Sequence, residues 1–366
     1  MKTKIAFSFL IGTFFLVGCD ENPKPATLDK IEVVINDIPF QTEIYYRIPY
    51  TMKTWEWENE GLKLKRIIVL DDLSKSELMT IDEPDLPFIY VDPLDPNPYV
   101  TYDKISNYYL SIQLPIPLNH TIPATISHRF ILRDTVQHKD VTVEGGLFSP
   151  RLDEVPIVIS SPVKGDNWLF TNQSTNDYHF FCLFFVNGII GRGERFAFDN
   201  VQLNDEMEDI LVGDPKVNES YCNYKDTLYA VADGKILTIK DGRVENNGDA
   251  QDAPLNSLDE YGGNYLVQEM SGGHYAFYGH CVPNSFMVDE GDDVKEGDPI
   301  ALLGNSGNSS APHLHFQIAD GTDILFSYGL PFVLKKYTKV ADFETGPVTP
   351  VVVNNAMMEQ NSIICF

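Results

Sequence analysis

The sequence predicts a mainly β protein, with an N-terminal β-sandwich-like domain followed by a C-terminal domain of antiparallel strands. Short runs rich in β-branched and aromatic residues alternate with turns rich in Pro, Gly, Asn and Asp along most of the chain. Helical periodicity is nearly absent, and only 201–211 suggests a short helix, with an acidic loop as the alternative. About 348 residues follow an N-terminal signal-like segment, which is enough for two domains.

The N-terminal segment 1–18 is typical of a secretory signal. Lys2 and Lys4 precede an uncharged run that is too short to span a bilayer as a permanent helix. The run ends at Leu16-Val17-Gly18-Cys19, which resembles the bacterial lipobox, where a cysteine receives lipid and becomes the new N-terminus. We therefore expect lipidation of Cys19 and an exported protein anchored by lipid on the periplasmic or surface side of the envelope; a buried structural cysteine is the alternative.

The charge of the chain restricts its partners. The full sequence carries 27 basic and 53 acidic side chains, a net charge of −26. Cleavage after residue 18 removes two lysines and gives 25 basic against 53 acidic side chains, or −28. Such a surface repels nucleic acid and anionic lipid headgroups, so we expect no nucleic-acid partner and a membrane contact only through the lipid anchor.

Residues 19–30 contain two prolines and mixed charge, which predicts a lipidated tether, and residues 31–150 form the first predicted domain. Its predicted strands are 30–38, 62–70, 108–114, 126–132 and 141–144. This alternation of strands and turns is typical of a β-sandwich of the immunoglobulin-like kind. His120, His128 and His138 have no partners at metal-ligand spacing, so we interpret them as surface or core residues and expect a structural or binding role for this domain.

The second predicted domain covers residues 151–345, and residues 346–366 form a predicted C-terminal extension. The predicted strands of this second domain are 178–186, 195–201, 227–232, 235–239, 265–269, 274–278, 299–303 and 313–318. These short strands with intervening turns predict mainly antiparallel pairing.

The strongest local motif in this domain is a glycine-rich turn that leads into two histidines, within the segment 304–316 (GNSGNSSAPHLHF). Because successive side chains in a strand alternate between faces, His313 and His315 share one face, about 6–7 Å apart, and Leu314 faces the opposite layer. One imidazole can then hold a metal ion while the other reaches a water or a substrate. In a chain of eight histidines, the pair alone is weak evidence for a metal site, so the interpretation depends on the surrounding motifs.

The context is a set of motifs in the order and spacing of the lysostaphin/LytM-type metallopeptidases. These motifs are Ala230-Val231-Ala232-Asp233-Gly234, Gly262-Gly263-Asn264-Tyr265, Tyr278-Gly279-His280, the run 291–298 (GDDVKEGD), and the two histidines. The chain resembles this family over about residues 155 to 340. The resemblance implies an antiparallel β metallopeptidase domain with a substrate groove, one Zn2+ per chain, and the peptide cross-links of bacterial peptidoglycan as the substrate.

The resemblance also implies the site residues. In the family, zinc is held by a histidine and an aspartate of an early HxxxD motif and by the second histidine of the HxH pair. The first histidine of the pair and one from a neighbouring strand assist catalysis. Carried over to this sequence, Asp199 and His315 are zinc ligands, and His313 and His280 are the catalytic pair.

The early motif departs from the family pattern, because Arg195 occupies the usual histidine position in the run 195–199 (RFAFD). A guanidinium cation cannot ligate zinc. We favour His179 as the third ligand, because the predicted strands 178–186 and 195–201 can pair as a hairpin centred near residue 189, which sets residue 179 opposite 199 or 200 on the same face. The stretch 161–199 also resembles a subgroup of the family that has the same early histidine and arginine.

His274 is the rival third ligand. It has the same strand parity as His280, but it follows Gly272-Gly273 at a strand start, where a solvated histidine is the ordinary interpretation.

Three protein ligands leave one position for water, whose pKa zinc lowers to near 7. The expected reaction is metal-assisted hydrolysis of a peptide bond. His313 would take the proton of the water, and His280 would stabilise the oxyanion or protonate the leaving amine. The sequence does not assign these two roles to one histidine or the other.

A catalytically degenerate module is the alternative function. Some domains of this type have lost ligands and instead bind peptidoglycan or activate another hydrolase. The presence of Asp199, His280, His313 and His315 favours the enzyme. Three roles are open for the N-terminal domain, namely covering the groove, positioning the enzyme, and binding a partner.

Overall fold

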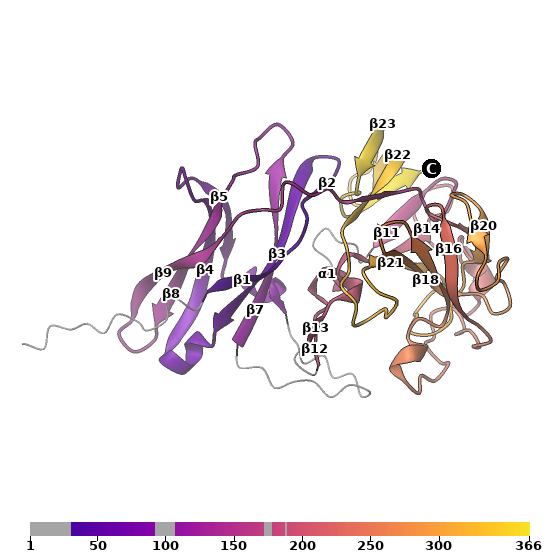
Figure 1. Cartoon of the computed structure of the whole chain (residues 1–366), viewed down its shortest axis with the longest axis horizontal. Coiled ribbons are helices and arrows are strands. Elements are labelled where there is room, and N and C mark those ends of the chain that lie inside the picture. Colours follow the sequence, from indigo (N-terminus) through magenta and orange to yellow (C-terminus); the bar gives the residue numbers. More distant parts are fainter. Residues whose placement is uncertain (1–30, 92–106, 172–177, 187–188) are drawn as a thin grey trace, which may run out of the picture.

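The computed structural model describes residues 31–91, 107–171, 178–186 and 189–366. Two β-rich lobes lie side by side, the first formed by the N-terminal strands and the second by the C-terminal strands (Figure 1). The predicted signal segment, the tether and Cys19 lie outside the described residues. Within the described ranges, no helix combines the length and the apolar character needed to cross a bilayer.

The N-terminal lobe consists of two antiparallel sheets. Its strands are β1 (Glu32–Asn36), β2 (Phe40–Gln41), β3 (Tyr45–Trp55), β4 (Leu62–Asp71), β5 (Glu77–Asp82), β6 (Tyr90–Val91), β7 (Asn107–Pro117), β8 (Ile126–Asp134) and β9 (Lys139–Phe148). One sheet has the order β1-β3-β7-β6, with β2 beside β3, and the other has the order β5-β4-β8-β9. Side chains from both sheets, including Leu110 and Phe130, form one buried core with Trp57, so the predicted β-sandwich is confirmed.

His128 is a core residue of this sandwich, whereas His120 and His138 are exposed. The hydroxyl of Tyr50 lies 2.7 Å from His128 Nε2, and His128 Nδ1 lies 3.1 Å from the carbonyl oxygen of Gly146. A carbonyl oxygen only accepts, so Nδ1 carries the hydrogen and Nε2 accepts from the tyrosine. Burial lowers the pKa of His128 to about 4, and the ring is therefore neutral at physiological pH.

The C-terminal lobe is built on one large sheet. Its strands are β10 (Ile157–Ile159), β11 (Trp168–Thr171), β14 (Phe198–Gln202), β16 (Gly234–Lys240), β17 (Asn264–Met270), β18 (His274–Cys281), β19 (Asp293–Val294), β21 (Leu314–Ala319), β22 (Phe332–Asp342), β23 (Gly346–Ala356) and β24 (Ser362–Cys365). The order is β10-β22-β24-β11-β14-β21-β18-β17-β16-β19, and β23 pairs with β22. Only β10 and β22 run parallel among the described pairs of this sheet, so the prediction of a mainly antiparallel domain is confirmed.

The remaining elements are short. They are β12 (Phe184–Val186), β13 (Ile189–Gly191), β15 (Thr227–Tyr229), β20 (Pro299–Leu302), the helix α1 (Tyr178–Phe181), and 3-10 helices at Trp57–Glu60, Leu86–Phe88, Gly193–Phe196, Asn218–Ser220 and Leu258–Glu260. The strands pair as β12 with β13 and as β15 with β20. The segment that follows β14, up to residue 211, contains turns, which agrees with the loop alternative for 201–211.

The hairpin predicted from 178–186 and 195–201 is wrong. Residues 178–181 form α1, and the hairpin that follows begins at Phe184, which pairs with Gly191, so it does not include residue 179. The second predicted strand begins only at Phe198, because Gly193–Phe196 is a 3-10 helix. Strand β14 pairs instead with β11 and β21.

The last part of the chain, predicted as an extension, contributes two strands to the large sheet. β23 pairs with β22, and β24 lies between β22 and β11. Ile363 and Ile364 of β24 are buried. The sheet that carries the site described below therefore extends through residues 346–366.

Candidate active site

The centre of the site is a pair of residues on neighbouring strands. Asp199 of β14 lies directly opposite His315 of β21, and His315 Nδ1 is 3.0 Å from Asp199 Oδ1. Directly opposed residues of an antiparallel pair project from the same face. On the other side of β21, Gly279 of β18 lies opposite His315. A Cβ atom at Gly279 would lie 3.4 Å from the Cβ of His315, so the glycine leaves room for the imidazole.

His179 reaches this pair from helix α1. Its Nε2 lies 3.8 Å from Asp199 Oδ2, and its ring stands perpendicular to the His315 ring with 4.9 Å between centroids. One ligand atom from each of His179, Asp199 and His315 lies within 4.8 Å of the others, and all three groups are buried or nearly so. The structure thus brings together the three residues that the sequence analysis selected, although α1, and not the predicted hairpin, supplies His179.

The rival residue His274 lies elsewhere. It pairs with Met270 at the first position of β18, whereas Gly279, five residues later, is the residue opposite His315. At about 3.4 Å per residue, His274 is roughly 17 Å further along the strand. It does not belong to the His179, Asp199 and His315 group.

The donor atoms of this group fit a zinc ion. Two imidazole nitrogens and one carboxylate oxygen are a common ligand set of catalytic zinc sites. Ligand bonds of about 2.0–2.2 Å in a tetrahedral arrangement put the donor atoms about 3.3 Å apart. The two separations from the Asp199 carboxylate, 3.0 Å from Oδ1 to His315 Nδ1 and 3.8 Å from Oδ2 to His179 Nε2, lie on either side of that value.

Gln317 fixes the protonation of His315. The Gln317 amide nitrogen donates to the carbonyl oxygen of Ile324 at 2.7 Å, so its oxygen faces His315 Nε2 at 2.9 Å. That oxygen only accepts, so Nε2 carries a hydrogen and Nδ1 is the nitrogen available to a metal. Gln317 was not predicted as a site residue, although its position two residues after His315 puts it on the same face of the strand.

The charges of this group stabilise one another. Burial alone would raise the pKa of Asp199, but the nearby His179 and His313 and the hydrogen bonds from His313 and His315 hold it well below its usual value. Burial would lower the pKa of His315, but its hydrogen bond and charge interaction with Asp199 raise it to about 9. The proton on His315 Nδ1 occupies the position that a metal ion would take.

His280 and His313 lie next to this group, with 4.6 Å between their ring centroids. His313 Nδ1 is 2.8 Å from the carbonyl oxygen of Ala311, so it carries the hydrogen. His313 Nε2 lies 3.5 Å from Asp199 Oδ1 and is the nitrogen that faces the site. His280 Nδ1 donates in the same way to the carbonyl oxygen of Ser306 at 2.7 Å, which leaves Nε2 as the acceptor.

The backbone of His280 is unusual, with φ = 64° in the left-handed region. Residues other than glycine rarely adopt this region, and such residues concentrate at functional sites. His280 is held there by a hydrogen bond from its N–H to the carbonyl oxygen of Gly262. Burial, followed by the charges of His313 and His315, holds the pKa of His280 well below its usual value.

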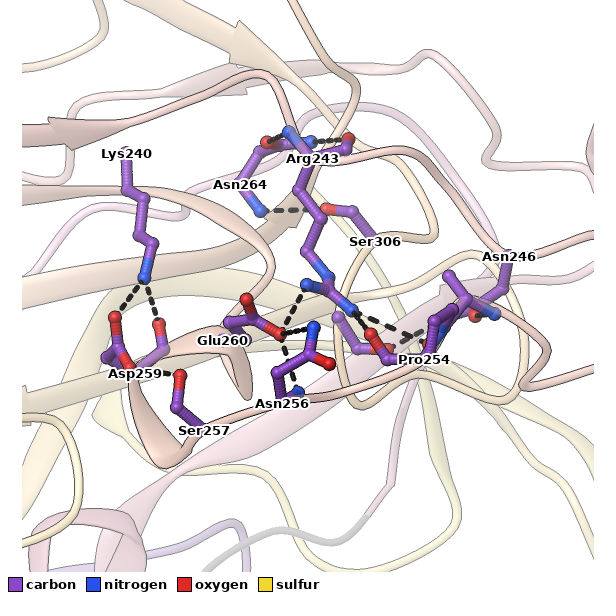
Figure 2. Close-up of polar contacts among 12 residues, drawn as sticks. Lys240, Arg243, Asn246, Pro254, Asn256, Ser257, Asp259, Glu260, Asn264 and Ser306 are labelled. Carbon is purple, nitrogen blue, oxygen red and sulfur yellow. Dashed lines mark hydrogen bonds and ion pairs between the residues drawn. The ribbon is translucent and has the colours of Figure 1, made fainter.

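A polar network supports the loop that accepts the hydrogen bond from His280 (Figure 2). The backbone N–H of Asn264 donates to Ser306 Oγ at 2.9 Å, and Ser306 Oγ donates to the carbonyl oxygen of Cys281 at 2.8 Å. Asn246 Nδ2 lies 2.9–3.1 Å from three carbonyl oxygens of the same loop. Arg243 and Glu260, joined at 2.7 Å, hold the neighbouring segment. This network holds the loop whose Ser306 carbonyl oxygen accepts the hydrogen bond from His280.

Arg195, at the family's histidine position, points away from the metal-binding group. Its side chain is fully buried, and its Nε donates to Asp37 Oδ2 of the N-terminal domain at 2.7 Å. Its Nη1 donates to the carbonyl oxygen of Phe180 at 2.9 Å. Arg195 is therefore an interdomain residue and contributes no ligand atom.

The His-Asp-His group and the two further histidines beside it are the kinds of side chain that a metallopeptidase site requires. Residues 222–325, which lie within the C-terminal domain, match the model of peptidase family M23. The matched range contains His280, His313 and His315, whereas His179 and Asp199 precede it.

Several known proteins resemble parts of the chain. The chain is 31% identical over 91 residues to the peptidoglycan DD-endopeptidase ShyB of Vibrio cholerae. This match covers 25% of this chain and only 17% of ShyB. The lysostaphin catalytic domain from Staphylococcus simulans is 24% identical, with a TM-score of 0.23 over 31% of this chain and 78% of that domain. A structure of the SpoIIIAH and SpoIIQ complex is 14% identical, with a TM-score of 0.28 over 47% of this chain and 96% of the matched chain.

Proposed function

We propose that this protein is a zinc-dependent endopeptidase that hydrolyses peptide cross-links of bacterial peptidoglycan. One observation carries the proposal: the buried ligand atoms of His179, Asp199 and His315 lie within 4.8 Å of one another, directly beside His280 and His313. Metal ligands and proton-transfer groups together are the parts that metal-assisted hydrolysis requires.

His179, Asp199 and His315 would hold the zinc ion. When bound, zinc acts as a Lewis acid that lowers the pKa of water and polarises a carbonyl oxygen. Gln317 keeps His315 in the tautomer that presents Nδ1 to the ion. Their burial excludes bulk water from the ligands, which strengthens electrostatic interactions at the site.

His313 is the proposed general base. Its Nδ1–H is committed to the Ala311 carbonyl, so Nε2, 3.5 Å from Asp199, is the nitrogen that faces His179, Asp199 and His315, and it carries the lone pair when the ring is neutral. A proton taken from water would be held at this nitrogen. His280 also presents Nε2, because its Nδ1–H is committed to Ser306. The proton held at His313 would pass to His280, whose ring centroid lies 4.6 Å away, and His280 Nε2 would donate it to the oxyanion or to the leaving amine.

The substrate is proposed from the relatives. ShyB is described as a peptidoglycan DD-endopeptidase, and residues 222–325 match the model of peptidase family M23, which supports a peptidase. The acidic net charge of −26 agrees with a substrate other than nucleic acid. We assign the peptide part of peptidoglycan as the substrate, because the site is built for metal-assisted attack on a carbonyl group.

We also propose that the protein is exported and held on the envelope by a lipid on Cys19. The signal-like run and the lipobox-like residues before Cys19 support this proposal. Two or three acyl chains, at roughly 0.8 kcal/mol per buried methylene, would suffice as an anchor. Peptidoglycan lies on the outer side of the cytoplasmic membrane, where such an anchor would place the enzyme.

The experiment is digestion of purified peptidoglycan by the purified protein, with mass spectrometry of the released fragments. We expect zinc near one equivalent, fragments with newly formed amino and carboxyl termini, and loss of cleavage on chelation that zinc restores. A folded, metal-free protein that binds peptidoglycan and releases no fragment would instead establish the binding module.

A further inference from the structure

A buried ion-pair cluster connects the two domains beside the metal-binding group. Asp37, in the segment between β1 and β2 of the N-terminal domain, contacts two arginines of the C-terminal domain. Arg195 Nε lies 2.7 Å from its Oδ2, and Arg192 Nη1 lies 2.9 Å from its Oδ1. Asp37 is 3% exposed and Arg195 is 0% exposed, so this cluster is inside the interface and is not a surface pair.

The same guanidinium of Arg195 holds helix α1. Its Nη1 donates to the carbonyl oxygen of Phe180, and its Cζ lies 4.0 Å from the centroid of the Phe180 ring. Phe180 directly follows His179 in the chain. Arg195 therefore joins Asp37 of one domain to the residue next to the third zinc ligand in the other.

The hairpin after α1 also rests on the N-terminal domain. Leu183 lies directly before β12, and Phe185 lies within it. Both belong to a buried cluster with Ile35 of β1 and Tyr109 of β7. The rings of Tyr109 and Phe185 are 4.5 Å apart. Figure 1 shows α1, β12 and β13 between the two lobes. A four-residue helix is too short to be stable by itself, so its position depends on these contacts.

A second interdomain contact lies on another part of the interface. Arg47 of β3 forms an ion pair with Glu359, which follows β23, and Thr42 also donates to Glu359. Met357 N donates to the carbonyl oxygen of Gln41 at 2.8 Å. This contact fastens the domains on the β22–β23 side of the large sheet and does not involve α1, so it provides a matched control.

We infer that the N-terminal β-sandwich completes the zinc site of the C-terminal domain, with Asp37 and Arg195 as positioning residues that hold His179 toward Asp199. The inference rests on the proposed function, since it assumes that His179 is a zinc ligand. This role is additional to the three that the sequence left open for the N-terminal domain, which were covering the groove, positioning the enzyme and binding a partner. It also explains why an arginine stands at the family's histidine position: the ligand has moved to α1, and Arg195 fixes α1.

The test compares zinc affinity, measured by chelator competition with Zn2+ alone, among full-length variants of equal secondary structure. Asp37→Ala should weaken zinc binding by about 10-fold or more, since loss of a residue that orients a ligand typically costs 10–100-fold. Asp37→Glu, which keeps the carboxylate, should recover most of the affinity. Glu359→Ala should bind zinc like the wild type. Equal affinity of Asp37→Ala and the wild type would overturn the inference, whereas a wild type without zinc would overturn the proposed function itself.

Hydrogen exchange of the wild-type chain decides the question even if Asp37→Ala does not fold. Coupling between two sites is reciprocal, so zinc binding must tighten the domain contact if the contact tightens zinc binding. We expect Zn2+ to slow exchange in peptides that cover 32–41 and 178–186, with no change in β4. Exchange at 32–41 that is insensitive to zinc, in a protein that binds zinc, would overturn the inference.

Discussion

His315 Nδ1 donates a hydrogen bond to Asp199 Oδ1 at 3.0 Å across directly opposed positions of β21 and β14. The backbone register of the sheet sets this pair. The third member of the group, His179, comes from a short helix whose position depends on neighbouring contacts. The site therefore combines a pair set by the sheet with a third residue that is held from outside the sheet.

The first prediction concerns this third ligand. His179→Ala should lose most of the bound zinc, because two protein ligands remain and the vacated position admits water. His274→Ala, at the far end of β18, should retain full occupancy. Zinc per chain, measured by elemental analysis after dialysis, distinguishes the two. Full occupancy in His179→Ala with loss in His274→Ala would show that His274 is the ligand.

The second prediction concerns Gln317. Gln317→Ala removes the acceptor that fixes the His315 tautomer, so zinc affinity should fall by about 10–100-fold while the fold persists. Gln268→Ala is the control, because Gln268 is an equally buried glutamine on β17 that contacts Tyr278 and Ala232 instead of a ligand. Chelator competition on both variants is the measurement. Similar zinc affinities for the two variants would show that Gln317 does not support the zinc site.

The third prediction is a pH dependence of stability from His128. In the unfolded chain a histidine takes up its proton near pH 6.5, whereas folded His128 has a pKa of about 4. Between these values the unfolded state binds more protons, so stability present above pH 6.5 is lost as the pH falls toward 4. This one group should contribute a loss of about 3 kcal/mol.

Urea unfolding at several pH values, followed by tryptophan fluorescence, checks this contribution, because Trp55 and Trp57 lie in the same core as His128. His128→Gln should lower stability at neutral pH and show a shallower loss between pH 6.5 and 4. The exposed His138→Gln should follow the wild type. Identical slopes for His128→Gln and the wild type would contradict the assignment.

The fourth prediction concerns the N-terminus. Protein expressed with its signal in a bacterial host should carry an acylated Cys19 as its first residue, because the lipobox-like sequence directs cleavage before it. Cys19→Ala should shift the protein from the membrane fraction to soluble or unprocessed fractions. Mass spectrometry of the intact protein is the measurement, and an unlipidated N-terminus at another residue would refute the prediction.

Local rules were sufficient for part of the site. The alternation of side chains in a strand put His313 and His315 on one face, and the motif order identified His280 and Asp199. The family resemblance indicated His179, but the strand pairing used to support it was wrong, because α1 and the 3-10 helix at Gly193–Phe196 interrupt the two predicted strands. Periodicity does not resolve elements of four residues.

Other features depended on contacts that no local rule reveals. The partner of Arg195 is Asp37, 158 residues away in the sequence. Strand β3 was not predicted, and it contains Pro49, a residue that normally argues against an inner strand. The strand assignment therefore failed where tertiary pairing overrides local propensity.

The most direct test of the account is the pair of variants His313→Ala and His315→Ala, each assayed for zinc content and for digestion of purified peptidoglycan. His315→Ala should lose zinc and activity together, because it removes a ligand. His313→Ala should keep zinc near one equivalent and lose activity by about 10²–10⁴-fold, as expected for a general base. Digestion by His313→Ala at the wild-type rate would contradict the catalytic assignment. So would a wild-type protein that holds zinc and cleaves no type of peptidoglycan.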